Sequence, residues 1–140
     1  MGQLEMTNHS DEDGSNMIAP TCAFASGMAA VASLLLACKS PTKILIPSDV
    51  YHGVPTQLHS ALNDHGIMHE SVDMTNCNEI QQKIEENIGS ATDEGCLVVW
   101  LETPSNPLCQ VTDIQAVCNI VQNIRSQNKR ILIVVDSTWA

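Results

Sequence analysis

The feature that most constrains the fold is the alternation of short apolar runs with helix-like segments from about residue 43 onward. Two runs, at 96–101 and 131–135, contain only apolar residues, which is typical of strands buried on both faces. Shorter or weaker strand patterns lie at 43–47 and 67–72. Strands that alternate with helices build right-handed βαβ units. We therefore predict an α/β fold, a three-layer and mostly parallel sheet with helices on both faces.

Four segments favour helix, and two of them begin with the pattern of a capping residue followed three positions later by Glu or Gln. The segments are 27–38, which is Ala-rich, 54–65, the residues after an Asn76–Glu79 cap, and the residues after a Thr112–Gln115 cap. In the last two, isoleucines and valines recur at helical spacing. Residues 1–21 are polar, acidic and aperiodic, so we predict a disordered N-terminal extension ahead of a globular part at 22–140.

Charge excludes several functional classes. The chain has 16 acidic and 6 basic residues, for a formal net charge of −10. A nucleic-acid interface needs a basic patch, and an anionic membrane surface would also repel this chain. We find no apolar run of membrane-spanning length. The histidines are scattered and the cysteines are widely spaced, so no metal site is predicted.

The six cysteines also bear on localisation. The first twenty residues lack a secretory signal pattern, and without one reduced thiols in an intracellular protein are the better interpretation. We predict a cytoplasmic protein, and an organellar location stays open.

Polar residues follow three of the predicted strands. Asp49 and Tyr51 come after the first strand, and the segment Glu102-Thr-Pro-Ser-Asn-Pro107 comes after the third. Asp136 and Thr138 follow the last strand. In open α/β sheets, ligands bind outside the carboxyl ends of the strands, so these residues are the candidates for a binding site.

Each candidate has a chemical use and a structural alternative. The Ser26-Gly27-Met28 turn could hold a phosphate at a helix N-terminus, or could simply cap the helix. Tyr51 could stack on a flat ligand, or could be a partly buried tyrosine. Asp136 could keep a heterocyclic nitrogen protonated, or could cap a helix. The motifs of dinucleotide-binding, P-loop and serine-hydrolase sites are absent.

Four segments together resemble the Cys/Met-metabolism family of pyridoxal 5′-phosphate (PLP) enzymes, which includes cystathionine γ-synthase and the cystathionine lyases. They are Ala23-Phe-Ala-Ser-Gly-Met-Ala-Ala30, Asp49-Val-Tyr-His-Gly53, Val99-Trp-Leu-Glu-Thr-Pro-Ser-Asn-Pro107 and Val134-Val-Asp-Ser-Thr-Trp139. The resemblance runs from about residue 22 to the end, and its most specific block is Glu-Thr-Pro-Ser-Asn-Pro. It implies that residues 22–140 are part of the large, PLP-binding domain of fold type I.

The resemblance implies roles for the residues on either side of the cofactor. The backbone of Gly27 and Met28 would hold the cofactor phosphate. Tyr51 would stack on the ring and is the one catalytic candidate in this chain.

The remaining implied roles fall on the two later segments. Asn106 would lie near the ring hydroxyl, with Glu102 in the supporting network. Asp136 would pair with the pyridine nitrogen, with Thr138 beside it.

The chain also departs from the family pattern. The Schiff-base lysine lies in a Ser-x-x-Lys motif that comes later than Ala140, so we expect a chain truncated before the catalytic lysine. His52 replaces the first of two glycines after the family's tyrosine, and Gly53 retains the second. Thr56 stands where lyases of the family often carry an arginine, so the substrate stays open.

These observations predict a fragment of a transsulfuration-type enzyme, a lyase or transferase that performs γ-elimination or γ-replacement. Candidate substrates are an O-acylated homoserine, cysteine or cystathionine, and the family implies a homo-oligomer, usually a homotetramer. The segment Asp-Ser-Thr-Trp favours a γ-synthase slightly. The alternative is a catalytically inactive PLP-binding or subunit-interaction module. In either case the isolated chain is not expected to catalyse transsulfuration.

Overall fold

A computed structural model describes residues 9–10, 16–17, 21–38, 42–60, 63–88, 96–124 and 130–140 of the chain. Its main sheet contains β3 (Thr42–Pro47), β4 (Ile67–Val72), β5 (Cys96–Glu102) and β6 (Ile131–Asp136). The strand order is β4-β3-β5-β6, and every neighbouring pair is parallel. The predicted parallel α/β sheet is therefore confirmed.

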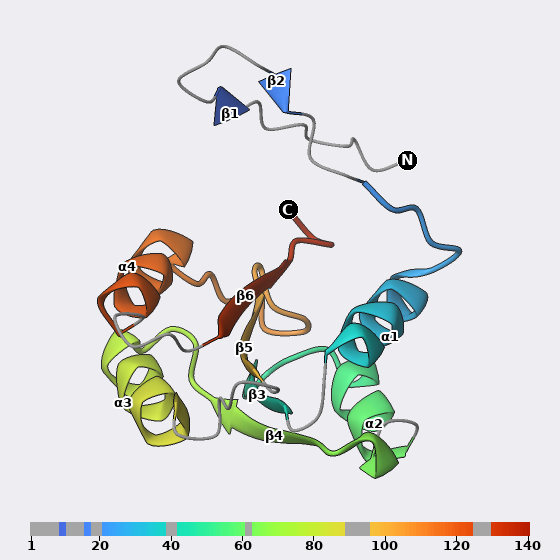
Figure 1. The fold of residues 1–140 in the computed structure, drawn as a ribbon, viewed down its shortest axis with the longest axis horizontal. Coiled ribbons are helices and arrows are strands. Elements are labelled where there is room, and N and C mark those ends of the chain that lie inside the picture. Colours follow the sequence, from blue (N-terminus) through green and yellow to red (C-terminus); the bar gives the residue numbers. More distant parts are fainter. Residues whose placement is uncertain are drawn as a thin grey trace.

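Two pairs of helices cover the two faces of this sheet (Figure 1). One pair is α1 (Gly27–Ala37) and α2 (Gly53–Ser60), and the other is α3 (Cys77–Asn87) and α4 (Ile114–Ile124). This gives the three layers that the sequence predicts. The three helical crossovers, which contain α2, α3 and α4, keep the strands parallel, so the carboxyl ends of all four strands lie at one edge of the sheet, where a ligand site is expected.

Strand β5 connects the two hydrophobic cores. Its alternate side chains point to opposite faces, as the pleat of a strand requires. Leu97, Val99 and Leu101 pack in the core under α3 and α4, whereas Val98 and Trp100 pack in the core under α1 and α2. All seven residues of β5 are buried, as their apolar run predicts.

The prediction that the last apolar run is also fully buried is wrong. Leu132 and Val135 of β6 are 39% and 41% exposed. Within the part of the chain that the structure describes, β6 pairs only with β5. Composition alone indicates a strand, but burial also requires a neighbour on each side, and that depends on the position of the strand in the sheet.

Two helix limits differ from the sequence prediction. The helix expected at 54–65 ends at Ser60, and a 3₁₀ turn follows at η1 (Asn63–His65). Residues 61 and 62 between them lie outside the described residues. The capping residue of α4 is Asp113, whose Oδ1 accepts the N–H of Ala116 at 2.9 Å. Thr112 cannot cap because it is buried one position earlier, where its N–H donates to Thr103 Oγ1.

Two short described segments near the N-terminus form a separate small element. Strands β1 (His9–Ser10) and β2 (Asn16–Met17) pair in antiparallel fashion outside the main sheet. The other residues of the predicted disordered extension lie outside the described ones, except Thr21. Among the described helices, none is long and apolar enough to cross a membrane.

Candidate cofactor site

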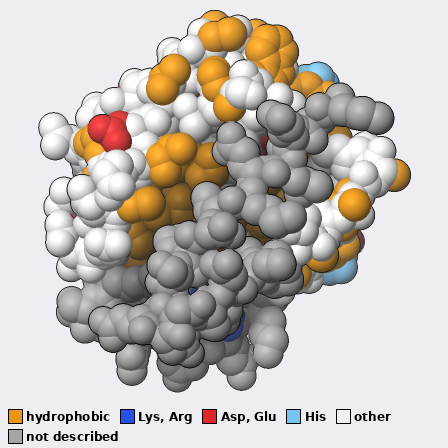
Figure 2. Space-filling view, turned by 90° about the horizontal axis from the view of Figure 1, so that it is seen from above, with side chains coloured by type: hydrophobic (Ala, Val, Ile, Leu, Met, Phe, Trp, Pro, Cys, Tyr) orange, Lys and Arg blue, Asp and Glu red, His pale blue; other side chains and the backbone are white. Residues whose placement is uncertain are grey.

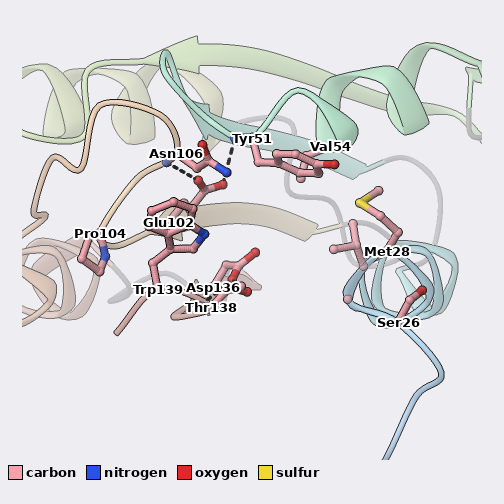
Figure 3. A pocket seen from close by; sticks show the side chains of 12 residues that line it. Ser26, Met28, Tyr51, Val54, Glu102, Pro104, Asn106, Asp136, Thr138 and Trp139 are labelled. Atoms are coloured by element: carbon pink, nitrogen blue, oxygen red, sulfur yellow. Dashed lines mark hydrogen bonds between the residues drawn. The ribbon is translucent and has the colours of Figure 1, made fainter. Parts of the chain in front are cut away.

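The carboxyl ends of β3, β5 and β6 meet the N-terminus of α1 around a cavity of about 330 Å³ (Figure 3). This volume lies in the range of small-ligand pockets, about 300–1,000 Å³. All of the site residues predicted from the sequence line it. They are Gly27, Met28, Tyr51, Glu102, Asn106, Asp136 and Thr138. Four segments that are far apart in the sequence therefore build one site.

The α1 side of the cavity offers free backbone N–H groups. Ser26 is the N-cap, and its Oγ and carbonyl oxygen accept the N–H groups of Ala29 and Ala30 at 3.1–3.2 Å. No acceptor for the N–H groups of Gly27 and Met28 is found among the described residues. A Cβ at Gly27 would meet no atom within 4 Å, so the backbone there is open. Such an N-terminus suits an anion, because the N–H groups and the helix dipole both favour negative charge.

Tyr51 follows β3 and presents its ring to the cavity. The ring packs over Gly53: a Cβ at Gly53 would collide with Tyr51 Cε1 and lie 2.9 Å from Met28 Sδ. The ring of His52 contacts the Tyr51 ring edge-on, with 4.6 Å between the centroids. Gly53 therefore leaves the space in which the Tyr51 ring lies, and the half-exposed ring can meet a flat ligand.

Glu102 ties two walls of the cavity together. Its Oε2 accepts the N–H of Tyr51 at 3.0 Å, and its Oε1 accepts the N–H of Asn106 at 2.6 Å. Burial raises the pKa of this carboxyl above its usual range, and the neighbouring Asp136 and Asp49 act in the same direction. The two N–H donors lower the pKa but do not cancel this rise. Because both oxygens already have a donor, the role of Glu102 in the site is to hold the backbone of Tyr51 and Asn106 in place.

Asp136 ends β6 with one oxygen available. Its Oδ1 accepts both the N–H and the hydroxyl of Thr138, at 3.0 and 2.5 Å. No partner for Oδ2 is found among the described residues. A half-buried carboxylate oxygen without a partner suits a donor on a ligand, such as a protonated ring nitrogen.

Five further residues line the cavity but were not among the predicted site residues. They are Ser26, Val31, Val54, Pro104 and Trp139. Ser26, Pro104 and Trp139 belong to the segments that resemble the family, so their neighbours in sequence already pointed to them. Val31 and Val54 carry no such signal, because an apolar residue on a helix is normally a core residue.

The charged side chains that the described residues place around the cavity are all of one kind, carboxylates. Its lining contains Glu102 and Asp136, and no Lys, Arg or His among the described residues. A ligand with a cationic group near Asp136 and an anionic group at α1 would match this arrangement. The described residues also contain no group of three or more His, Cys, Asp or Glu side chains placed to hold a metal ion. The residues present thus fit the phosphate, the flat ring and the ring nitrogen of PLP.

Comparisons with known proteins agree with this geometry. The model of the family described as "Cys/Met metabolism PLP-dependent enzyme" matches residues 15–140. Cystathionine beta-lyase MetC of Bacillus subtilis is 37% identical over 100 residues, which are 71% of this chain and 24% of the relative. Cystathionine gamma-lyase of Saccharomyces cerevisiae is 32% identical over 119 residues, which are 84% of this chain and 27% of the relative.

A solved structure shares the fold. The crystal structure of metB from Corynebacterium glutamicum superposes with a TM-score of 0.63 at 27% sequence identity, over 81% of this chain and 26% of the other. The chain belongs to the Cys/Met metabolism family of PLP-dependent enzymes. It spans about a quarter of the length of the relatives that it matches.

Proposed function

We propose that this chain forms the PLP-binding part of an enzyme that performs γ-elimination or γ-replacement in sulfur amino-acid metabolism. Candidate substrates are an O-acylated homoserine, cysteine or cystathionine. The observation that carries the proposal is the meeting of Asp136, Tyr51 and the N-terminus of α1 in one cavity. Family membership supports it independently.

Each wall of the cavity would meet one part of the cofactor. The N–H groups of Gly27 and Met28 would donate to the phosphate, and the Tyr51 ring would lie against the pyridine ring. Oδ2 of Asp136 would accept the ring N–H and keep the proton on that nitrogen. Bound PLP supplies an electron sink for the pair left at Cα when an amino acid loses its proton.

The remaining polar residues would orient these groups. Thr138 holds Oδ1 of Asp136, which would leave Oδ2 free to accept a hydrogen bond from the ring nitrogen. Glu102 fixes the backbone at Tyr51 and Asn106, so the side chain of Asn106 would lie beside the ring hydroxyl. Tyr51 is also the candidate for proton transfer at the substrate, since its hydroxyl is the titratable group of the ring that faces the cavity.

The proposal can be tested with pyridoxine 5′-phosphate, which has the ring nitrogen and the phosphate but no aldehyde to react with surface lysines. We expect the chain to bind this probe, with quenching of tryptophan fluorescence because Trp139 lines the cavity, and Asp136→Asn to weaken binding about tenfold to a hundredfold. A hydrogen bond to a charged group is worth about 1.5–3 kcal/mol, and 1.4 kcal/mol corresponds to a factor of ten.

Asp64→Asn is the matched control, because Asp64 is an exposed carboxylate on η1 and does not line the cavity. Equal affinities of the wild type and Asp136→Asn would contradict the proposed role of Asp136. Binding of the probe without turnover of any candidate substrate by the complete protein would favour the inactive PLP-binding module instead.

A further inference from the structure

The loop that follows β5 turns back on itself around Ser105. The N–H of Ser105 donates to the carbonyl oxygen of Gln110 at 2.9 Å, and its own carbonyl oxygen accepts the N–H of Cys109 at 2.8 Å. The Ser105 hydroxyl oxygen accepts the N–H of Gln110 at 3.0 Å. Ser105 is 2% exposed, so its own side of these bonds is shielded from water, whereas Cys109 and Gln110 are exposed. The backbone from Asn106 to Cys109 is thereby closed into a tight turn.

The Ser105 hydroxyl links this turn to another part of the chain. A hydroxyl has one proton to donate, and here it donates to Oδ2 of Asp49, which lies 56 positions earlier in the sequence. Asp49 stands two residues before Tyr51 in the connection from β3 to α2. A hydrogen bond to an ionised carboxylate is stronger than one between neutral groups. The turn is therefore attached to the segment that carries Tyr51.

The same two segments are joined a second time at Glu102, which accepts the N–H groups of Tyr51 and Asn106. Asn106 is thus held directly by the hydrogen bond from its own N–H to Glu102, and indirectly by the hydrogen bond from Ser105 to Asp49. Loss of the Ser105–Asp49 bond would detach the turn from the Tyr51 segment at Ser105, so that Glu102 alone would still link Asn106 to that segment. The amide side chain, which lines the cavity, would then turn with the backbone.

From these contacts we infer that Asp49 and Ser105 are positioning residues, which hold Asn106 and Tyr51 in register across the cofactor cavity. The inference rests on the proposed function for what Asn106 and Tyr51 touch. The position itself is a property of the chain without any ligand, so it can be measured separately.

Hydrogen exchange of backbone amides, followed by NMR on the ¹⁵N-labelled chain, tests the inference. Ser105→Ala and Asp49→Ala should each speed exchange of the Asn106 and Gln110 amides about tenfold to a hundredfold, because the turn that carries both amides would lose its hydrogen bond to the Asp49 carboxylate and open more often. Asp49→Asn keeps an oxygen acceptor and should change these rates less than Asp49→Ala. The double variant should exchange no faster than the faster single variant, because both remove the same bond.

Ser48→Ala is the matched control: Ser48 is exposed, directly precedes Asp49, and its hydroxyl has no partner among the described residues. The amide of Val99 in β5 reports on the whole fold and should keep its wild-type rate in every variant. Unchanged exchange at Asn106 in both alanine variants overturns the inference. An equal loss of protection at Val99 overturns it too, because the substitutions would then loosen the fold rather than the turn.

Binding of pyridoxine 5′-phosphate separates this inference from the proposed function. If the wild type binds, the two alanine variants should bind about tenfold more weakly or worse, and wild-type affinity in both would overturn the inference. If the wild type does not bind while Ser105→Ala still frees the Asn106 amide, the proposed function fails and the positioning role stands.

Discussion

Cys38 lies at the end of α1, half-buried against the core that α1 and α2 share with the sheet. Burial, together with the neighbouring Cys96, raises the pKa of the Cys38 thiol to about 11, although Arg130 acts in the opposite direction. The ordinary value is 9.0, so the folded chain binds this proton more tightly than the unfolded chain does. The thiol consequently adds stability that is fully present below pH 9.

We predict that this contribution is lost as the pH rises from about 9 to about 11. In that interval the unfolded chain has released the proton and the folded chain still holds it, so the free energy of unfolding falls. Urea unfolding at several pH values should show a steeper decline for the wild type than for Cys38→Ala. Cys118→Ala, at another partly buried thiol, is the control, and equal slopes for wild type and Cys38→Ala would contradict the prediction.

The candidate site could be predicted largely at the level of single residues. Asp136, Glu102 and Tyr51 are chemically distinctive, and the carboxyl ends of parallel strands meet at one edge, so their convergence follows from the fold class. The bonds that orient them could not be predicted. The contact of Ser105 with Asp49 joins residues 56 positions apart, and it depends on the path of two loops rather than on any local pattern.

The helix caps illustrate what local sequence can decide about an element. Asn76 caps α3 as predicted, since its Oδ1 accepts the N–H groups of Asn78 and Glu79. Glu79, however, accepts the N–H of Asp73 instead of returning to Asn76. At α4 the cap lies one residue later than predicted. Thr112 is buried and bonded to Thr103, and Asp113 caps the helix instead.

Removal of the Asn76 cap should destabilise the chain through α3. Asn76→Ala leaves two N–H groups of the first turn without their acceptor, so we predict a loss of about 1 kcal/mol in the free energy of unfolding. Asn78→Ala is the control, because Asn78 is exposed within the same helix and contributes only its backbone N–H to the cap. Chemical denaturation of both variants measures the difference; a cost for Asn78→Ala as large as that for Asn76→Ala would contradict a capping role.

The strands show the limit of an argument from composition. The runs that form β5 and β6 are equally apolar, yet β5 is buried along its whole length and β6 is not. Hydrophobicity alone cannot distinguish a central strand from an outer one, because both need an apolar face. Strand order is a property of the assembled sheet, and it was not predicted from the sequence.

The molecule as a whole presents an apolar region beside β6. A second cavity of about 350 Å³ lies between α1 and β6 and is lined mainly by apolar side chains, including Leu34, Trp100 and Val134. Viewed from the side on which the C-terminus lies, hydrophobic side chains gather in a hollow of this face (Figure 2). Leu132 and Val135 of β6 are also exposed, and apolar side chains exposed beside an outer strand favour association.

We predict that the 140-residue chain self-associates through β6 and that Val135→Lys reduces this association. A lysine on an outer strand disfavours strand pairing because the buried charge would lack a partner. Val111→Lys is the control, since Val111 is 71% exposed but lies in a loop. Sedimentation velocity at several protein concentrations measures the effect, and equal association of the two lysine variants would contradict a role for β6.

The shared position of β5 has a consequence for how the chain unfolds. Each core takes its central side chains from the same seven residues, alternately from one face and the other. Neither helical layer can detach without exposing the back of a strand on which the other layer rests. Both layers should therefore melt together as one cooperative unit, with the slowest-exchanging amides along β5. Such a strand makes the site at its carboxyl end as stable as the entire domain, since Glu102 is its last residue.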